Sequence, residues 1–359
     1  MLRGLAALAV VLFHYRSYLV PDGADRTVPD SLFGWGGIGV DLFFVISGFI
    51  MVYVTDGKGY GLKTSASFIV NRLIRIVPMY YLILLVAFLT GGAMSTFHYA
   101  DKVDNLISAL TFRPYLQSPP PLYIESSGMY NVRWTLNYEI YFYMAFSLCL
   151  LVKPRLIVLA FWFALPVVVV YYLKGEFTLS AKGYAFDSVF ARFLTNPIIL
   201  EFGFGALAGF VYKKVSHYVE GKSALVPILI ATAIGMAIST RELTAYNLLS
   251  GIAFSVLVLT FALYSNVVTR SFPQFLITLG NILFSLYLIH NPLAGFISGK
   301  VEKLLPGSMH GVPGFVALLT MSILVAYLTH HYIEVKLIQF LRKKLHTGRI
   351  SALDGTPVS

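Results

Sequence analysis

Charged side chains are scarce in this chain, and their scarcity argues against a soluble globular protein. Asp, Glu, Lys and Arg together make up 12% of the 359 residues, hydrophobic residues make up 57%, and the mean hydropathy is +0.74. The single cysteine, Cys149, excludes a disulfide within the chain. Internal repeats and low-complexity linkers are also lacking, so a separate soluble domain is not predicted.

Motifs that mark many common active sites are lacking as well. The chain contains no Gly-Lys-Ser/Thr phosphate loop, no Gly-x-Ser-x-Gly nucleophile turn and no spacing typical of metal ligands. Basic residues outnumber acidic ones, 27 to 17, but they lie between apolar segments, where they orient a membrane protein. We therefore predict that the protein binds neither a metal nor nucleic acid, and that membrane lipid surrounds it.

Long apolar segments are what the chain has in abundance. Spans of about 20 residues each leave room for about ten helices in a chain of this length. The predicted helices cover residues 3-20, 36-55, 74-93, 134-152, 156-173, 195-212, 224-240, 245-265, 274-297 and 313-334. They predict an all-α integral membrane protein with about ten transmembrane helices. The ninth helix is the least secure of these predictions, because Pro273 and Pro292 bracket it and are able to bend it.

The charge pattern predicts how these helices are oriented. The segments that share one side of the membrane with the N-terminus carry most of the basic residues, so both termini are predicted to be cytoplasmic. The largest outer loop, 94-133, contains Pro119-Pro120-Pro121 and is expected to be irregular. We expect one polytopic domain over residues 1-345 and a disordered cytoplasmic tail over 346-359.

The first predicted helix carries two ionisable side chains, Arg3 and His14, on one face. They are eleven residues apart, which is three turns with about 20° left over and about 16 Å along the axis. An ionisable side chain this deep in a bilayer normally faces a protein interior or a wet cavity. No small-residue cleavage site follows the apolar run, so a cleaved signal peptide is not favoured. The helix therefore indicates a membrane enzyme.

Two further segments pair polar groups. Arg72 and Arg75 share a helix face and together suit a phosphate or pyrophosphate, although basic residues at a cytoplasmic helix start need no ligand. Glu139 and Tyr143 also face together, and Glu139 lies more than one turn inside its span. Trp134, at the start of that span, also fits an interfacial aromatic belt.

Three polar residues lie singly in apolar helices. The Asp41 carboxylate needs a partner, for which His14 or an arginine is the natural candidate; a place near the outer membrane boundary is the alternative. Glu201 and His290, each taken alone, are more typical of structural hydrogen-bonding groups.

Together these motifs resemble the acyltransferase family 3 membrane proteins. The resemblance covers nearly the whole chain in the family's order, and its first two motifs are the most specific. It is carried by Arg3-Gly4-Leu5-Ala6-Ala7-Leu8 with His14, by Gly39-Val40-Asp41-Leu42-Phe43-Phe44-Val45-Ile46-Ser47-Gly48-Phe49, by Arg72-x-x-Arg75, by Trp134-Thr135-Leu136-x-x-Glu139-x-x-Phe142-Tyr143, by Ser285-Leu286-Tyr287-Leu288-Ile289-His290-x-Pro292 and by Tyr332-Ile333-Glu334.

The stretch from Asn196-Pro197 to Glu201-Phe202 leans toward the bacterial exopolysaccharide acetyltransferases of the succinoglycan type. Two features depart from the family pattern: only two residues precede Arg3, and no soluble esterase-like domain is attached. We therefore expect an enzyme that works without a partner domain, and we leave the natural start of the chain open.

The resemblance implies a multi-pass enzyme of the bacterial inner membrane that carries out O-acetylation. An acyl group, usually acetyl, passes from cytoplasmic acyl-CoA to a carbohydrate hydroxyl, so acetyl-CoA is a substrate rather than a resident cofactor. The acceptor is a polysaccharide, such as an exopolysaccharide, or a lipid-linked oligosaccharide. The acceptor sugar, the acyl group, the membrane face of the acceptor and the oligomeric state stay open.

Under this hypothesis the predicted catalytic residues are His14, Asp41 and Glu139. His14 is the general base, because imidazole accepts a proton near neutral pH. Asp41 or Glu139 orients its ring and stabilises the imidazolium. A covalent acetyl-histidine is an alternative to direct transfer.

The remaining candidates bind or support the substrates. Arg3, Arg72 and Arg75 are predicted to hold the coenzyme A phosphates, or Arg3 to steady a carboxylate. Tyr143 or Asn137 is predicted to donate to the oxyanion. The predicted supporting residues are Trp134, Asn137, Tyr143 and His290.

Two other functions stay open from the sequence. A transporter of a polysaccharide precursor or another anionic solute also places arginine, histidine and acidic residues in mid-membrane, although no pair of repeats is visible. A structural subunit of a polysaccharide-export complex would tolerate the loss of His14.

Overall fold

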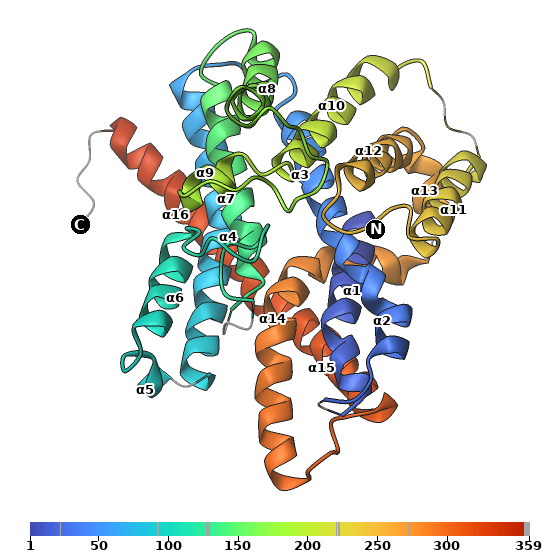
Figure 1. Ribbon diagram of the computed structural model, residues 1–359. Coiled ribbons are helices and arrows are strands. Elements are labelled where there is room, and N and C mark those ends of the chain that lie inside the picture. Colours follow the sequence, from blue (N-terminus) through green and yellow to red (C-terminus); the bar gives the residue numbers. More distant parts are fainter. Residues whose placement is uncertain are drawn as a thin grey trace.

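The structure, a computed structural model, describes residues 1–21, 23–91, 93–126, 130–219, 221, 223–271 and 273–354. These residues form helices joined by loops (Figure 1). Within them no strand forms; one isolated bridge pairs Ser180 with Asn247. The all-α architecture expected from the sequence is confirmed.

The helices of the first half are α1 (Leu2–Tyr15), η1 (Arg16–Leu19), α2 (Thr27–Phe33), η2 (Gly34–Ile38), α3 (Gly39–Val54), α4 (Leu62–Thr90), α5 (Ala93–Thr96), α6 (Ala100–Thr111), α7 (Arg133–Cys149) and α8 (Arg155–Lys174). Those of the second half are α9 (Val189–Leu194), α10 (Ile199–Val215), α11 (Leu225–Ser239), α12 (Leu248–Leu263), α13 (Ser265–Ser271), α14 (Gln274–Leu304), α15 (Val312–Thr329), the π-helical turn η3 (His330–Glu334) and α16 (Val335–Asp354).

Each of the ten predicted segments contains a helix, but fewer helices are long enough to cross a membrane by themselves. In the described part of the chain, six segments pass by length and apolar composition: Thr27–Val54, Leu62–Thr90, Arg155–Lys174, Val189–Val215, Gln274–Leu304 and Val312–Lys344. A seventh results if α12 and α13, bent by 84°, count as one span. Because α1 has 14 residues and α7 has 17, both fall short of the 20 or so that a bilayer requires. The predicted count of ten and the cytoplasmic termini are not confirmed.

Helix α4 begins twelve residues earlier than predicted, at Leu62 rather than at residue 74. The polar first turns hide a helical pattern, because Ser65 and Phe68 are buried on the same side as Ile76 further along. Arg72 and Arg75 therefore lie inside a long helix and not at its start, which corrects the sequence interpretation.

Three other boundaries also differ from the sequence interpretation. The loop 94-133, expected to be irregular, contains α6, whose apolar residues recur at helical spacing. Helix α14 continues through Pro292 to Leu304, so this proline does not end the helix. Helix α16 extends to Asp354, into the expected tail, and residues 355–359 lie outside the described part. The division at residue 345 stays a prediction.

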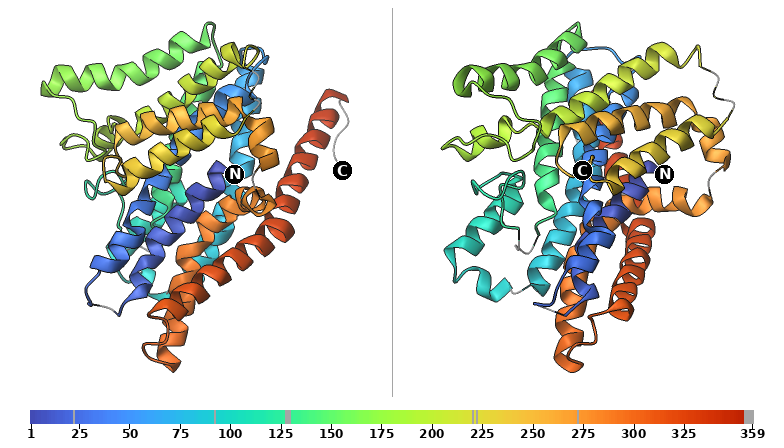
Figure 2. Two further views of the ribbon diagram at one scale, coloured as in Figure 1. Left: turned by 90° about the vertical axis from the view of Figure 1, so that its right-hand side faces the viewer. Right: turned by 45° about the vertical axis from the view of Figure 1, so that its right-hand side comes forward.

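Close approach of helix backbones holds the centre of the molecule. A Cβ atom on Gly4 of α1 would lie 2.6 Å from the backbone nitrogen of Gly280 in α14, so only glycine allows this contact. Gly48 of α3 approaches the backbone of Phe202 in α10 in the same way. Figure 2 shows α15 and α16, in red, following one another as a long rod along one side. Helix α1 lies in the centre, where it contacts α3, α14 and α15.

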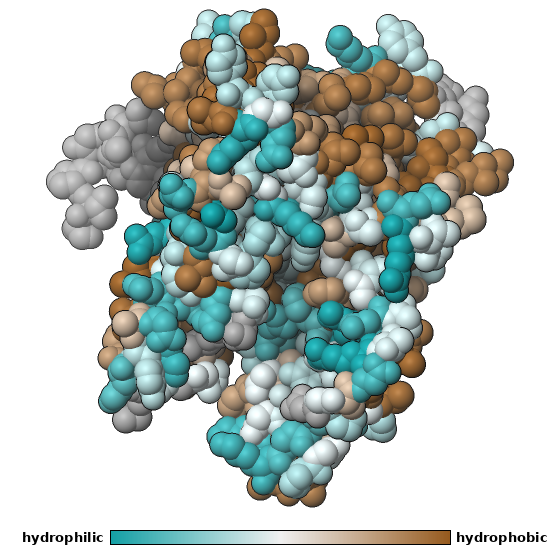
Figure 3. Space-filling view, in the orientation of Figure 1, coloured by the Kyte–Doolittle hydropathy of each residue, from teal (hydrophilic) through white to brown (hydrophobic). Residues whose placement is uncertain are grey.

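The outer surface matches a membrane protein. Ile157, Phe161 and Val168 of α8 are each more than half exposed, which water would disfavour and lipid would not. In Figure 3 hydrophobic residues gather over α8 and the α10–α12 region, whereas hydrophilic residues gather over α6 and the lower edge near α14.

Candidate active site

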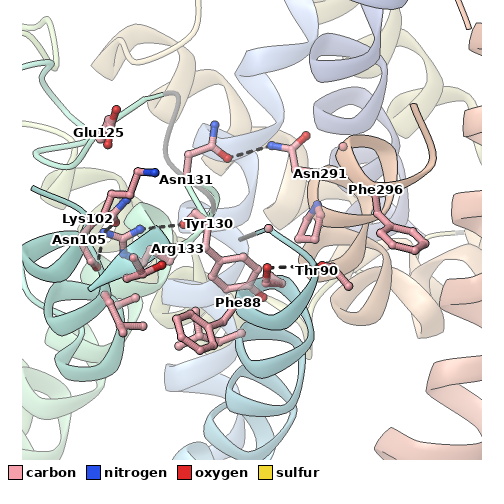
Figure 4. A pocket seen from close by; sticks show the side chains of 18 of the residues that line it. Phe88, Thr90, Lys102, Asn105, Glu125, Tyr130, Asn131, Arg133, Asn291 and Phe296 are labelled. Carbon is pink, nitrogen blue, oxygen red and sulfur yellow. Dashed lines mark hydrogen bonds between the residues drawn. The ribbon is translucent and has the colours of Figure 1, made fainter. Parts of the chain in front are cut away.

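A cavity of about 650 Å³ opens between α1, α4, α6, α14 and the start of α7 (Figure 4). Its volume falls within the range of small-molecule binding sites. His14, in the last turn of α1, lines it together with Phe88 of α4, Asn105 of α6, Arg133 of α7 and Asn291 of α14. Residues from five helices thus line one cavity. We call it the large cavity.

Arg133 forms a polar wall of the large cavity. The side chain is fully buried, and its Nη2 donates to Asn105 Oδ1 at 2.6 Å and to Ser108 Oγ at 3.2 Å. Its Nη1 donates to the carbonyl oxygen of Tyr130 at 3.1 Å. Lys102 lies on the same side in Figure 4. These bonds fix a guanidinium at the cavity wall, where N–H donors match hydroxyl or carboxylate oxygens.

The other side of the large cavity combines amide and aromatic side chains. Asn291 Nδ2 donates to Asn131 Oδ1 at 2.9 Å, and Phe296 lies beyond Asn291 on α14, with Phe88 of α4 between the two sides in Figure 4. Amides both donate and accept hydrogen bonds, and aromatic rings offer apolar faces. This lining suits a molecule with many hydroxyls and apolar C–H faces, such as a sugar.

His14 contacts a second histidine, His290 of α14. His290 Nε2 lies 3.0 Å from His14 Nδ1, and the two ring centroids are 5.0 Å apart. His290 is fully buried, whereas His14 borders the large cavity. The sequence nominates both residues but does not predict that they meet; the close α1–α14 contact brings them together.

Hydrogen bonds around this histidine pair determine which ring nitrogens carry protons when both rings are neutral. His290 Nδ1 lies 3.1 Å from the carbonyl oxygen of Leu286. A carbonyl can only accept, so His290 Nδ1 donates and His290 Nε2 accepts from His14 Nδ1–H. His14 Nε2 then keeps its lone pair. The pair therefore leaves a nitrogen able to take a proton from a substrate hydroxyl.

Tyr15 fixes the contact between α1 and α14 next to the histidine pair. Its hydroxyl donates to the carbonyl oxygen of His290 at 2.7 Å. Because that bond uses its only hydrogen, the Ser322 hydroxyl of α15, 2.6 Å away, donates to Tyr15. Both Tyr15 and Ser322 are fully buried. These bonds hold α1, α14 and α15 together next to His14.

A second cavity of about 40 Å³ lies on the Arg3 side of the histidine pair, and we call it the small cavity. It is lined by Arg3 of α1, Arg75 of α4, Glu139 and Tyr143 of α7, and Tyr287 of α14. The Tyr143 hydroxyl donates to the Glu139 carboxylate. The structure therefore brings four predicted site residues together from three helices, and none of the four lines the large cavity.

Arg72 lies beside the small cavity. Its guanidinium is 5.6 Å from the ring centroid of Phe68 and 5.9 Å from that of Tyr143. Arg3 Nε is buried and has no hydrogen-bond partner among the described residues. With Arg75, three guanidiniums surround one small space, and their planar sets of N–H donors suit phosphate oxygens.

The two cavities follow one another along the same helices. On α1, Arg3 lines the small cavity and His14 the large one, about 16 Å further along the axis. On α4, Arg75 lines the small cavity and Phe88 the large one. The histidine pair therefore lies between a small arginine-rich space and a large polar space.

Asp41 lies away from the histidine pair. Its carboxylate accepts the backbone N–H groups of Tyr246 at 3.1 Å and Asn247 at 3.2 Å, and the carboxyl of Glu201 lies next to it. Both acids are fully buried. Among the described residues no hydrogen bond of the kind that the sequence interpretation expects joins Asp41 or Glu139 to His14; His290 lies at hydrogen-bond distance from that ring instead.

Trp134 and Asn137 are buried in α7 and line neither cavity. The Trp134 ring packs against Tyr246, with centroids 5.6 Å apart, and against Phe44, at 6.2 Å. The side-chain nitrogen and oxygen of Asn137 have no hydrogen-bond partner within the part of the chain that is described. Their supporting roles stay predictions.

Sequence reasoning misses Arg133, Tyr287 and the Asn131–Asn291 pair. Arg133 ends the predicted outer loop as a single basic residue with no charged neighbour, and Tyr287 is inconspicuous in an apolar run. One usable signal is that Tyr287 and Asn291, four residues apart, fall on one face of α14.

Metal ligation finds no support in the described residues, where no three His, Cys, Asp or Glu side chains gather to hold an ion. The absence of a metal remains a prediction.

Comparison with known proteins identifies relatives of the chain. Residues 1–331 match the acyltransferase domain family. Among curated proteins, the exopolysaccharide production protein ExoZ of Rhizobium meliloti (strain 1021) is 32% identical over 181 residues, which is 48% of this chain and 50% of ExoZ. The match therefore spans about half the length of that relative. No solved structure matches the chain.

Proposed function

The chain belongs to the acyltransferase domain family that its motifs resemble, and we propose that it transfers an acyl group from acyl-CoA to a hydroxyl of an exopolysaccharide or another cell-envelope carbohydrate. Acetyl is the acyl group that the family favours. The carbohydrate acceptor follows from the name of the relative and from the lining of the large cavity. A multi-pass position in the bacterial inner membrane, with both termini cytoplasmic, is part of the proposal.

The arrangement of the two cavities on either side of the histidine pair carries this proposal. Acyl-CoA brings its phosphates to the cluster of Arg3, Arg72 and Arg75, and its pantetheine arm carries the thioester from there through the small cavity toward His14. The carbohydrate enters the large cavity and presents a hydroxyl to His14. Donor and acceptor thus meet from opposite ends of α1.

The proposed reaction is direct transfer. His14 Nε2 takes the hydroxyl proton as the sugar oxygen forms a bond to the acyl carbon and the carbon–sulfur bond breaks. The proton then passes from His14 to the departing sulfur, which releases coenzyme A as the thiol. His290 accepts the hydrogen bond of His14 Nδ1 throughout and so stabilises the imidazolium.

Residues of the small cavity serve the donor. Glu139 accepts from Tyr143 and lies among the arginines, where its negative charge offsets part of theirs. The Tyr143 hydroxyl, the predicted donor to the oxyanion, already gives its single hydrogen to Glu139, so we propose that it donates to the oxyanion only by leaving that bond. Asn137 is a weaker candidate because it lines neither cavity.

The test uses purified protein in nanodiscs with acetyl-CoA labelled in the acetyl group. Polymeric and lipid-linked glycans from the source cell serve as acceptors. We expect label in glycan with the wild type, and at least a tenfold weaker apparent affinity for acetyl-CoA in Arg72→Ala/Arg75→Ala, since each lost charge-assisted bond is worth about 1.5–3 kcal/mol.

The matched control is Lys213→Ala, which removes a basic residue bonded to Asp56 outside both cavities. Folded protein that neither binds acetyl-CoA nor labels glycan would contradict the proposal and favour the transporter. Full transfer by the double variant would contradict the role of the arginines.

A further inference from the structure

Tyr287 lies beside both the small cavity and the histidine pair. It lines the small cavity, and its ring centroid lies 5.9 Å from that of His290. Phe43 of α3 packs edge-on against the same ring, at 5.6 Å and an interplanar angle of 73°, and also lines the small cavity. An acyl group that enters the small cavity on its way to His14 therefore passes these two rings.

Two hydrogen bonds hold the Tyr287 ring in this position. Its hydroxyl donates to the carbonyl oxygen of Val132 at 3.0 Å and lies 2.7 Å from the hydroxyl of Thr135. Both partners belong to the start of α7, and Tyr287 is only 6% exposed. A buried ring tied at its tip to a neighbouring helix keeps its place beside the small cavity.

The small cavity beside the rings of Tyr287 and Phe43 leaves little space for an acyl group. The small cavity, at about 40 Å³, has room for about three water-sized groups. An acetyl group, made of a carbonyl carbon, its oxygen and a methyl, fills such a space. Each further methylene of a longer acyl chain would have to displace the ring of Tyr287 or Phe43, and tight packing makes that costly.

We propose that Tyr287, backed by Phe43, determines the length of the transferred acyl chain and restricts the enzyme to acetyl-sized groups. This inference rests on the proposed function, since it presupposes that an acyl thioester enters the small cavity. Tyr287 acts by occupying space and not by contributing a reacting atom. Its hydroxyl matters only because it keeps the ring in place.

The test measures kcat/KM for acetyl-CoA, propionyl-CoA and butyryl-CoA with the glycan acceptors described above. We expect the wild type to prefer acetyl-CoA. We expect Tyr287→Ala and Phe43→Ala to raise the butyryl-to-acetyl ratio at least tenfold, since one methylene in a fitted pocket changes specificity about tenfold or more. Tyr287→Phe keeps the ring but loses both hydrogen bonds that hold it, so we expect a smaller rise in the ratio than with Tyr287→Ala, to within about threefold of the wild type.

Leu324→Ala, a half-exposed site on α15 outside both cavities, is the control for general destabilisation. If Tyr287→Ala does not fold, Phe43→Ala decides the outcome. An unchanged ratio in folded alanine variants overturns the inference while wild-type acetyl transfer still supports the proposed function. A wild type that uses no acyl-CoA overturns both, and one that already accepts butyryl-CoA as well as acetyl-CoA overturns the inference alone.

Discussion

Two pairs of ionisable residues lie inside apolar helices of this protein, and they have opposite surroundings. The His14–His290 pair borders the large cavity and leaves one ring nitrogen available. The Asp41–Glu201 pair is sealed between α3 and α10, and Asp41 is engaged by two backbone amides. A polar residue in an apolar helix can thus have a catalytic role or a structural one. Access to a cavity distinguishes the two roles in this protein.

The local packing explains why the pairs differ. Gly251 of α12 faces the side chain of Glu201 so closely that a Cβ would lie 2.8 Å from its Cγ, which leaves no room for a substrate. Around His14, by contrast, α4, α6 and α14 stand apart and leave the large cavity. We therefore propose catalysis for the first pair and the anchoring of the loop before α12 for the second.

Removal of the His14 side chain should have the largest effect on activity. We expect His14→Ala to lower kcat by about 10²–10⁴-fold, the usual contribution of a general base, while thermal stability stays near that of the wild type because the side chain borders a cavity. Labelled transfer and thermal unfolding in detergent measure the two effects. Full activity in a folded His14→Ala protein would show that His14 is not the general base.

Removal of the buried Asp41 carboxyl should instead lower stability and leave activity nearly unchanged. Asp41→Ala leaves two buried backbone N–H groups without an acceptor, and each such loss costs about 1–3 kcal/mol, so we expect a clear fall in the free energy of unfolding. Activity per folded molecule should change less than about threefold. If Asp41→Ala is stable and inactive, the catalytic role that the sequence suggests for Asp41 is correct and the contrast between the pairs fails.

The smallest expected effect concerns the second histidine. His290→Ala removes the acceptor for His14 Nδ1–H and should lower kcat about tenfold, with little change in KM for the glycan. His290→Gln supplies a side-chain oxygen that can accept the same bond and should recover part of the loss. Equal activity of the alanine and glutamine variants would show that ring orientation by residue 290 is unimportant.

Helix positions were predictable from the sequence to a large extent, because apolar length is a local property. All ten predicted segments contain a helix, and the shared face of Arg3 and His14 agrees with their places at successive cavities of α1. The start of α4 was not predictable in this way, because its first turns are polar and their burial depends on α7, through the Ser65–Ser147 hydrogen bond.

Partners across helices lay beyond sequence reasoning. His14 meets His290 because Gly4 lets α1 and α14 approach, and no local pattern states which helices are neighbours. For the same reason the sequence does not identify the partners of Asp41: its carboxylate accepts from backbone N–H groups before α12, more than two hundred positions away.

Transfer across a sealed membrane tests the central claim most directly. The protein is reconstituted into vesicles with one orientation, with labelled acetyl-CoA on one side and glycan on the other; neither crosses the bilayer unaided. Because the small and large cavities lie at opposite ends of α1, we expect label in glycan when acetyl-CoA is on the Arg3 side and glycan on the large-cavity side. Transfer only when both substrates share one side would contradict the account.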